Sequence, residues 1–393
     1  MSVEEYMNVF FIEQACDGTV GGSHTCLYNL VNNLDRDKYK VWVGFYQYNS
    51  YVDKLRGIGV DVLLLQRNAL VGGNTLIRKI RNWYRLIYKH RVELHEILSS
   101  HRIDLVVLNN SIAGGKDYVH VCNRYNVPLI AYERGFFQYK RSDISLSHRI
   151  NASIAVSCAI QHNMLQQKYS GNTSVIYDGI ATNTESPNKI SNNVDIKKKF
   201  GIPDNSIVIG IIGNIREWKG QKYFVKAFMS LGEKYCNLYG LVIGGHGPED
   251  IEYVNCIKNI AKGSDVGERL IFSGFRDDVP ELLKVFNVFI HASVEPEPFG
   301  MVILEAMFHK VPVIATNFGG PVESLANGEC GILVPPRDEQ AIIDGVEKYL
   351  SNPLFRAEIV NRAYKRVESE FDLRKTVDLV DDLFQDVVNR AKA

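Results

Sequence analysis

Short apolar runs alternate with helical patterns along the whole chain, and this alternation restricts the fold to the α/β class. Runs that are apolar throughout, such as Val106-Val107-Leu108, are typical of parallel strands buried on both faces. A first series of predicted strands covers residues 8–13, 41–46, 60–65, 105–108, 129–132, 154–156 and 174–177. A second series covers residues 207–212, 239–243, 270–272, 288–290, 311–315 and 331–334. We therefore predict two doubly wound, Rossmann-like domains, with ligands at the carboxyl ends of the strands and in the cleft between the domains.

A polar stretch at residues 182–193 separates the two series and is typical of a linker between domains. We predict a first domain at residues 1–185 and a second at 186–373, followed by a C-terminal helix within 374–393. The 393 residues, 46% of them hydrophobic, are enough for two buried cores.

The composition argues against several functional classes. Lys plus Arg and Asp plus Glu are both 45, so no global field would attract nucleic acid. The seven cysteines are scattered and form no Cys-x-x-Cys pair, which favours a reducing cytoplasm over a disulfide scaffold or a zinc site. Glu4 and Glu5 precede the first apolar run, where a signal peptide needs positive charge. We therefore expect a cytoplasmic protein, held at most on the inner face of the plasma membrane.

Two carboxylates, Glu297 and Glu305, stand eight positions apart in the run Glu-Pro-Phe-Gly-Met-Val-Ile-Leu-Glu. Pro298 suits the first position of a helix, which predicts Glu297 as the cap residue. The outward-facing amides of this helix start, those of Phe299, Gly300 and Met301, would then bind a diphosphate, and Val302 after them is a further donor-binding candidate. Glu305 would lie about 12 Å further along the helix axis, which suits a nucleotide-sugar. The alternative is an amphipathic core helix with one exposed and one salt-bridged Glu.

The segments around this pair resemble the donor-binding half of GT-B glycosyltransferases of the retaining family 4. The segments that carry the resemblance, besides the Glu-x7-Glu pattern, are 288–293, 306–316, 319–323 and 328–335. The resemblance covers nearly the whole chain and implies a metal-independent enzyme without a cofactor. Such an enzyme moves a sugar from a nucleotide-diphosphate donor, a UDP-sugar rather than a GDP-sugar, to a glycan or lipid-linked acceptor. By resemblance, Glu297 would bond the sugar hydroxyls and Glu305 the ribose hydroxyls, and bacterial surface polysaccharide or lipopolysaccharide synthesis is the implied pathway.

In this family, the loop after the first strand of the second domain supplies two cations to the leaving diphosphate. Lys219 falls on the Lys-Gly position, and Gly213 and Asn214 follow the strand. Asn214 stands where the family usually has Arg, so Arg216 is the candidate for the second cation. The alternative is a solvated Arg and Lys at a turn.

Other matched positions are less specific. Gly21 and Gly22 correspond to a glycine-rich loop that faces the reaction centre. Gly245 lies in a Gly-Gly-His-Gly-Pro run that resembles a nucleotide loop, and Phe275 and Arg276 lie where relatives contact the base. Asp250 occupies the place of the third glycine of a dinucleotide fingerprint, so NAD binding is weakly supported. His291, just upstream of Glu297, is a minor candidate.

Arg134 is a departure from the family pattern, because many members carry His-Gly at the end of this strand, with the His near the transferred sugar. Arg134 follows Glu133 and cannot act as a base at neutral pH, but it can pair with phosphate in a bidentate way. Its alternative role is a structural ion pair.

A basic amphipathic pattern at residues 76–100, with cations at Arg78, Arg81, Arg85 and Lys89, would suit contact with an anionic membrane surface. Its alternative is a helix packed on its own domain. Asp35 and Asp37 match a metal motif only formally, since they lie in a charged turn, and we expect no metal site. By resemblance, the first domain would lie on the acceptor side, the second would bind the nucleotide-sugar, and the C-terminal helix would cross back onto the first. The alternatives are a sugar-nucleotide epimerase of the same architecture, an NAD-dependent enzyme and an inactive nucleotide-sugar-binding module.

Overall fold

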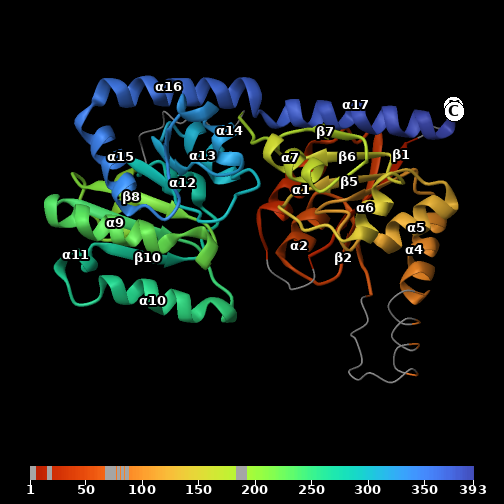
Figure 1. Ribbon diagram of the computed structural model, residues 1–393, viewed down its shortest axis with the longest axis horizontal. Coiled ribbons are helices and arrows are strands. Elements are labelled where there is room, and N and C mark those ends of the chain that lie inside the picture. The colour runs from red at the N-terminus through yellow and green to blue at the C-terminus, as the bar shows by residue number, and fades with distance from the viewer. Residues whose placement is uncertain are drawn as a thin grey trace. The chain divides into compact units, whose positions relative to one another are not determined.

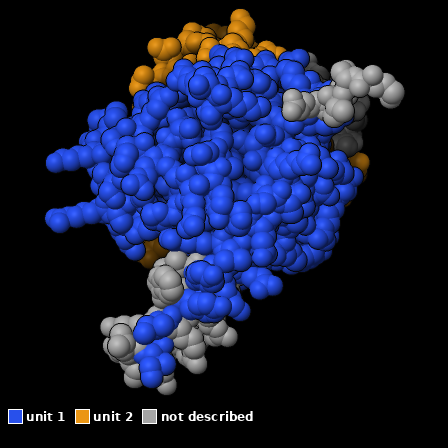
Figure 2. Space-filling view, turned by 90° about the vertical axis from the view of Figure 1, so that its right-hand side faces the viewer, with its two compact units in different colours: residues 1–179, 373–393 blue, residues 180–372 orange. Residues whose placement is uncertain are grey.

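The structure, a computed structural model, describes residues 6–15, 20–66, 77, 80, 84, 88–182 and 193–393. The chain forms two compact units, shown in Figures 1 and 2: unit 1 is Met1–Gly179 with Leu373–Ala393, and unit 2 is Ile180–Asp372. The predicted boundary at 185/186, and the predicted linker apart from its two end residues, lie outside the described residues.

Unit 1 is built on a seven-stranded sheet in the order β3-β2-β1-β4-β5-β6-β7, and all neighbouring strands are parallel. The strands are β1 (Met7–Glu13), β2 (Tyr39–Phe45), β3 (Asp61–Leu64), β4 (Leu105–Leu108), β5 (Leu129–Glu133), β6 (Ala152–Ala155) and β7 (Thr173–Val175). The chain runs outward from β1 to β3 and then resumes with β4 on the other side of β1. The loops after β1 and β4 therefore flank the switch point of this sheet, where doubly wound folds bind ligands.

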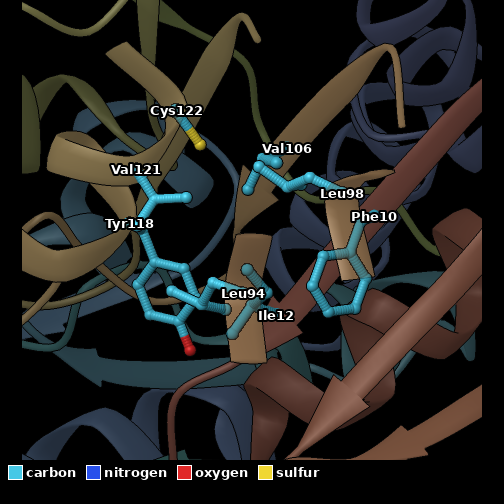
Figure 3. A pocket seen from close by; sticks show the side chains of 8 residues that line it. All are labelled: Phe10, Ile12, Leu94, Leu98, Val106, Tyr118, Val121 and Cys122. Atoms are coloured by element: carbon cyan, nitrogen blue, oxygen red, sulfur yellow. The ribbon is translucent and has the colours of Figure 1, made fainter. Parts of the chain in front are cut away.

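The helices of unit 1 connect these strands and cover the sheet (Figure 1). They are α1 (Gly22–Asn33), α2 (Ser50–Gly57), α4 (Lys89–Ser100), α5 (Lys116–Tyr125), α6 (Arg141–Ser147), α7 (Cys158–Gln166) and the C-terminal α17 (Leu373–Lys392), which contacts α1. Figure 3 shows how side chains of β1 and β4 meet those of α4 and α5, and the space they enclose is too small for a water molecule. This part of the sheet–helix core is closed to ligands.

Unit 2 has a six-stranded parallel sheet in the order β10-β9-β8-β11-β12-β13. The strands are β8 (Ile207–Ile212), β9 (Leu238–Ile243), β10 (Leu270–Gly274), β11 (Val288–His291), β12 (Val313–Thr316) and β13 (Ile332–Val334). The switch point of this sheet lies between β8 and β11, so the loops after these two strands are the expected ligand site.

The helices of unit 2 pack on this sheet around a core that includes Phe224, Phe228 and Tyr349, all fully buried. The α-helices are α8 (Asn193–Lys199), α9 (Gln221–Lys234), α10 (Ile251–Ala261), α11 (Asp265–Glu268), α12 (Val279–Leu283), α13 (Met301–Phe308), α14 (Gly320–Ser324), α15 (Glu339–Ser351) and α16 (Pro353–Glu370). Short 3-10 turns are η3 (Glu217–Lys219), η4 (Pro248–Asp250) and η5 (Ala326–Gly328).

The chain passes between the two units twice, at residues 179/180 and 372/373. Within unit 2, Ile180 forms a parallel bridge with Asp372, and its amide donates to the Phe371 carbonyl at 2.9 Å. Within unit 1, a Cβ added to Gly179 would lie only 2.7 Å from the Leu373 Cα. The two ends of each unit at these crossings are therefore neighbours.

The prediction of two doubly wound domains is confirmed, because each predicted strand has a counterpart in the order of the chain. Fully apolar runs identified the strands well because both faces of a parallel sheet are covered by helices. The predicted basic pattern at 76–100 lies partly outside the description, which includes Lys89 but not Arg78, Arg81 or Arg85. Among the described residues, no helix is long and apolar enough to span a membrane.

Candidate active site

Backbone hydrogen bonds join the loops at the carboxyl edge of the unit 2 sheet. The contacts are Gly244 N to Gly274 O (2.9 Å), Gly213 N to Ile243 O (2.9 Å), Ile215 N to Gly245 O (2.7 Å) and Val294 N to Trp218 O (2.8 Å). They connect, in sheet order, the loops that follow β10, β9, β8 and β11. Residues distant in the sequence are thereby held along one rim.

Gly220 explains how the loop after β8 can approach the loop after β11 so closely. Its φ is +69°, and an added Cβ would lie 1.9 Å from the Ala292 carbonyl oxygen. Any side chain there would push the two loops apart. The backbone of the preceding residue, Lys219, is thus held at the switch point, while its side chain stays free to turn.

Glu297 does not cap a helix, which corrects the sequence prediction. Helix α13 begins at Met301 behind Gly300, whose φ is +89°, whereas the Glu297 backbone pairs with Gly319 and accepts a hydrogen bond from Gly320 N at 2.8 Å. This pairing holds residue 297 outside the helix and overrides the local signal of Pro298. The 12 Å estimate assumed a continuous helix and therefore does not apply, but Glu305 still lies in α13.

The Glu297 carboxylate meets Lys219 at this rim. Lys219 Nζ lies 2.5 Å from Glu297 Oε2, and the Ser293 hydroxyl donates to the same oxygen at 3.3 Å. His291 Nε2 also lies 3.3 Å from it. Burial alone would raise the pKa of Glu297, but the charge of Lys219 and the contact with His291 outweigh burial and hold this pKa well below its usual range. The side chains of Lys219 and Glu297 are 20% and 11% exposed, so solvent reaches the pair.

Glu305 has a different environment. Its side chain is partly buried in α13, and among the described residues no hydrogen bond reaches its carboxylate. Burial without a compensating partner raises the pKa of Glu305 to about 7. A carboxylate in this position is suited to accept hydrogen bonds from a ligand. The amides of Met301 and Val302 begin the same helix, where helix geometry provides no acceptor for them.

Arg216 points elsewhere. Its Nη2 lies 3.7 Å from Glu249 Oε1 and its Nε lies 3.6 Å from Asp250 Oδ2, at the start of the segment after β9. Asn214, in the family's usual Arg position, accepts a hydrogen bond from the Gln221 side chain on its backbone oxygen at 2.9 Å. The structure therefore brings Lys219, and not Arg216, to Glu297.

The candidate base contacts lie at the end of β10. Phe275 is 71% exposed, so its ring is available to a partner. Arg276 is bound in a bidentate way to Asp278, at 2.8 and 2.5 Å. Gly245, next to them in sheet order, belongs to the hydrogen-bonded rim.

In unit 1, Arg134 is sealed inside the protein. It forms an ion pair with Asp178, and the two side chains are 7% and 9% exposed. Its Nε donates to the Asn109 carbonyl at 2.8 Å, its guanidinium carbon lies 4.3 Å from the centre of the Tyr132 ring, and its Nη2 is buried without a partner among the described residues. This is the geometry of the structural ion pair.

Asn109 extends this contact to the loop after β1. Its Nδ2 donates to Glu13 Oε2 at 2.7 Å and to the Ser23 carbonyl at 3.2 Å. Ser23 directly follows Gly21 and Gly22, which are exposed and would meet no atom of the described residues within 4 Å if they carried a Cβ. The glycines thus leave open space at the start of α1, beside a buried polar network.

Glu133, next to Arg134, is fully buried at the end of β5. It accepts hydrogen bonds from Ser111 Oγ at 2.5 Å, Ile112 N at 2.9 Å and Tyr139 Oη at 2.7 Å. Burial outweighs these bonds and raises the pKa of Glu133 to about 7. The neighbours of the candidate residues that the sequence analysis missed are Ser293 and Trp218 in unit 2, and Glu13, Asn109 and Asp178 in unit 1. A polar residue at the end of an apolar run was the available signal for Glu13 and Asn109.

Two family matches together cover most of the chain. Residues 192–366 match the family described as Glycosyl transferases group 1, and residues 20–184 match Glycosyltransferase Family 4.

Among the described residues, no group of three or more His, Cys, Asp or Glu side chains could hold a metal ion.

Individual relatives agree with these matches. An N-acetyl-alpha-D-glucosaminyl L-malate synthase of Bacillus anthracis is 27% identical over 64% of this chain and 65% of its own length. The chain thus spans slightly less than two thirds of that relative. A UDP-Gal:alpha-D-GlcNAc-diphosphoundecaprenol alpha-1,3-galactosyltransferase of Escherichia coli is 24% identical over 76% of this chain and 80% of its own length.

The fold also has solved counterparts. The crystal structure of Anabaena HepE in complex with UDP and glucose superposes with a TM-score of 0.83 at 22% identity, covering 97% of this chain and 100% of that one. At this identity the similarity concerns the fold, and it confirms the predicted GT-B architecture of two Rossmann-like domains.

Proposed function

We propose that this chain, which belongs to the group 1 glycosyltransferases of family 4, moves a sugar from a nucleoside-diphosphate donor to a glycan or lipid-linked acceptor. The observation that carries the proposal is the solvent-reached Lys219–Glu297 pair at the switch point of unit 2. A cation is required there because negative charge grows on the diphosphate as the glycosidic bond breaks.

The proposed roles combine the observed geometry with the resemblance to family 4. Lys219 stabilises the leaving diphosphate, Glu297 accepts hydrogen bonds from sugar hydroxyls and Glu305 accepts them from the ribose. Retention of configuration and independence from metal belong to the same proposal. Arg216 already faces two carboxylates and Arg134 is sealed, so we assign neither of them a direct contact with the substrate.

The donor and acceptor classes rest on the relatives. HepE was crystallised with UDP, and the Escherichia coli relative is named for a UDP-sugar donor and a diphosphoundecaprenol-linked acceptor. We therefore propose a UDP-sugar donor, a lipid-linked or glycan acceptor and a role in assembling a bacterial surface polysaccharide or lipopolysaccharide.

The first experiment is a thermal unfolding series with nucleoside diphosphates and nucleotide-sugars. A ligand present at about 100 times its Kd stabilises the native state by about 2.7 kcal/mol, which is a clear rise in Tm. We expect UDP and one UDP-sugar to give the largest rise. If no nucleotide changes the Tm of the folded protein, the proposed function is wrong.

A second measurement separates the proposed transferase from its alternatives. The donor selected by the series is incubated with and without glycan and lipid-linked acceptors. A transferase consumes the donor and forms a glycosidic product only with an acceptor. Donor conversion without an acceptor indicates an epimerase, and binding without turnover indicates an inactive module.

We also propose that residues 76–100 contact an anionic membrane surface. Of the described residues there, Ile77, Ile80, Tyr84 and Tyr88 expose their apolar side chains, and Lys89 is exposed beside them. Each cation near such a surface contributes about 1 kcal/mol, and salt screens it. Co-sedimentation with liposomes should therefore require acidic lipid and weaken at high salt. Equal sedimentation of a variant with Glu at positions 78, 81, 85 and 89 would contradict this proposal.

A further inference from the structure

Lys219 and Glu297 have separate tasks under the proposed function, yet in the structure they are partners of one another. We propose that this pair makes the site discriminate between the intact sugar donor and the free nucleoside diphosphate. The sugar hydroxyls of the donor would replace Lys219 on Glu297, whereas a nucleoside diphosphate brings no such group and must compete with Glu297 for Lys219. This inference rests on the proposed function and adds a specificity role to the pair.

Glu297 is the fixed member of the pair. Gly319 has a φ of +74°, and a Cβ there would lie 2.4 Å from the Glu297 carbonyl oxygen, so the two backbones are in direct contact. Ser293 and His291 also hold the carboxylate from the side. The position of Glu297 is therefore set by the rim, whichever ligand binds.

Lys219 is the member that can move. Its flexible side chain is 20% exposed, and its Nζ lies 4.2 Å from the centre of the Trp218 ring. The ring face attracts the ammonium group without fixing it in one geometry. Among the described residues, a Cβ built on Gly213 would come within 4 Å of Lys219 side-chain atoms alone, so the space beside Gly213 is otherwise open. The ammonium can thus swing from Glu297 toward a diphosphate.

The exchange has different consequences for the two ligands. When Lys219 leaves, the contacts that the described residues still make with the Glu297 carboxylate are those of Ser293 and His291, both at 3.3 Å, and this carboxylate is 11% exposed. A buried charge that loses its partner costs free energy. Sugar hydroxyls can offset that cost by donating to the carboxylate, but a nucleoside diphosphate cannot. The nucleoside diphosphate left after the reaction would therefore bind less tightly than it would if Lys219 had no partner. This weaker binding favours its release.

The test is a double-mutant cycle on the binding of UDP, or of whichever nucleoside diphosphate raises the Tm most, measured by calorimetry. Glu297→Gln should tighten binding by about three- to tenfold, because it releases Lys219 for the diphosphate. The same substitution in the Lys219→Met background should leave the affinity unchanged. Glu295→Gln removes an exposed carboxylate two residues away and should have no effect.

The outcomes separate the explanations. Equal tightening by Glu297→Gln in both backgrounds would mean simple repulsion between carboxylate and phosphate, and it would overturn the inference. Unchanged or weaker binding by Glu297→Gln would overturn it too. Glu297→Asp, which draws the carboxylate back by one methylene, should tighten binding to a smaller extent and replaces Glu297→Gln if that variant does not fold. If the folded wild type binds no nucleoside diphosphate, the proposed function fails, and the inference fails with it.

Discussion

The Arg134–Asp178 pair of unit 1 and the Lys219–Glu297 pair of unit 2 both lie at the carboxyl edge of a parallel sheet. The first is 7% and 9% exposed, and its Arg is further enclosed by Asn109 and the Tyr132 ring. The second is 20% and 11% exposed, and its Lys rests on the Trp218 ring. The same kind of charge pairing is therefore sealed in one unit and open to solvent in the other.

The difference in enclosure decides what each pair can do. The members of a sealed pair cannot exchange one another for a ligand, so the pair serves to hold the strand ends around it in position. An open pair can give up one partner when a ligand supplies another. A buried and a partly buried carboxyl group repeat the contrast: Glu133 in unit 1 is bonded by three donors, whereas Glu305 in unit 2 has a carboxylate without a hydrogen bond among the described residues.

The largest effect is expected from breaking the sealed pair. Arg134→Met should lower the free energy of unfolding by about 3–5 kcal/mol, because it leaves the Asp178 charge buried and unpaired. The double substitution Arg134→Met with Asp178→Leu should recover most of this loss. Urea unfolding measures both. A stable Arg134→Met variant that has lost donor turnover would show that Arg134 contacts the substrate, and the contrast between the pairs would be wrong.

Lys219→Ala should lower turnover about a hundredfold, equivalent to about 3 kcal/mol in the barrier, because its contact strengthens as the diphosphate leaves. Its stability should fall as well, because Glu297 loses its charged partner, but by less than that of Arg134→Met, since solvent reaches Glu297. Lys234→Ala is the matched control, since Lys234 pairs with Glu347 at 2.6 Å on the surface of the same unit. Wild-type turnover of Lys219→Ala would remove this loop from the reaction.

Glu305→Ala should weaken nucleoside diphosphate binding by about 1–3 kcal/mol, because it leaves ribose hydroxyls without an acceptor. The raised pKa of about 7 adds a pH dependence, since the ionised form is the better acceptor. Wild-type affinity should therefore rise between about pH 6 and pH 8 relative to Glu305→Gln. The titration of the ligand itself is common to both proteins and cancels in the comparison. Identical pH profiles would exclude Glu305 from the site.

Glu133 should show its pH dependence in stability instead of binding. Its pKa is raised from 4.5 to about 7 in the folded state. The protonated group therefore stabilises the folded state fully below pH 4.5, and this stabilisation is lost as the pH rises to about 7. Relative to Glu133→Gln, which mimics the protonated group, wild type should lose on the order of 2 kcal/mol across that range. Chemical unfolding at several pH values tests this. A constant difference between the two proteins would show that Glu133 does not titrate there.

The smallest effect is expected from Arg216→Ala. Ion pairs as exposed as those of Arg216 contribute at most about 1 kcal/mol, so turnover and stability should both stay close to wild type. A loss of turnover comparable to that of Lys219→Ala would mean that Arg216 leaves Glu249 and Asp250 to reach the diphosphate. Arg216 would then be a second cation that exchanges its carboxylate partners for the diphosphate, as we propose for Lys219.

Local patterns were enough to predict the strands and to select Glu297 and Glu305, whereas Lys219 was selected by the resemblance to family 4. They could not predict the pairing of charges, because Lys219 and Glu297 are separated by 78 positions and Arg134 and Asp178 by 44. The predicted cap at Glu297 failed for the same reason, since its backbone pairs with Gly319 on the other side of α13. Whether a charge is sealed or open depends on neighbours from several strands, and the sequence of one segment does not contain that information.

The adjacent crossings at 179/180 and 372/373 have a consequence for gene design. Unit 2 is one uninterrupted stretch of the gene whose first and last residues, Ile180 and Asp372, are bridged to each other. The stretch that encodes unit 2 can be removed as one piece, because the two ends of that unit already lie together. Domains with neighbouring termini tolerate such excision and rejoining well. Residues 180–372 should therefore be expressible alone, with Lys219, Glu297 and Glu305 in place. The remaining gene, rejoined from Gly179 to Leu373 by a short Gly-Ser connector, would encode unit 1 as a separate protein.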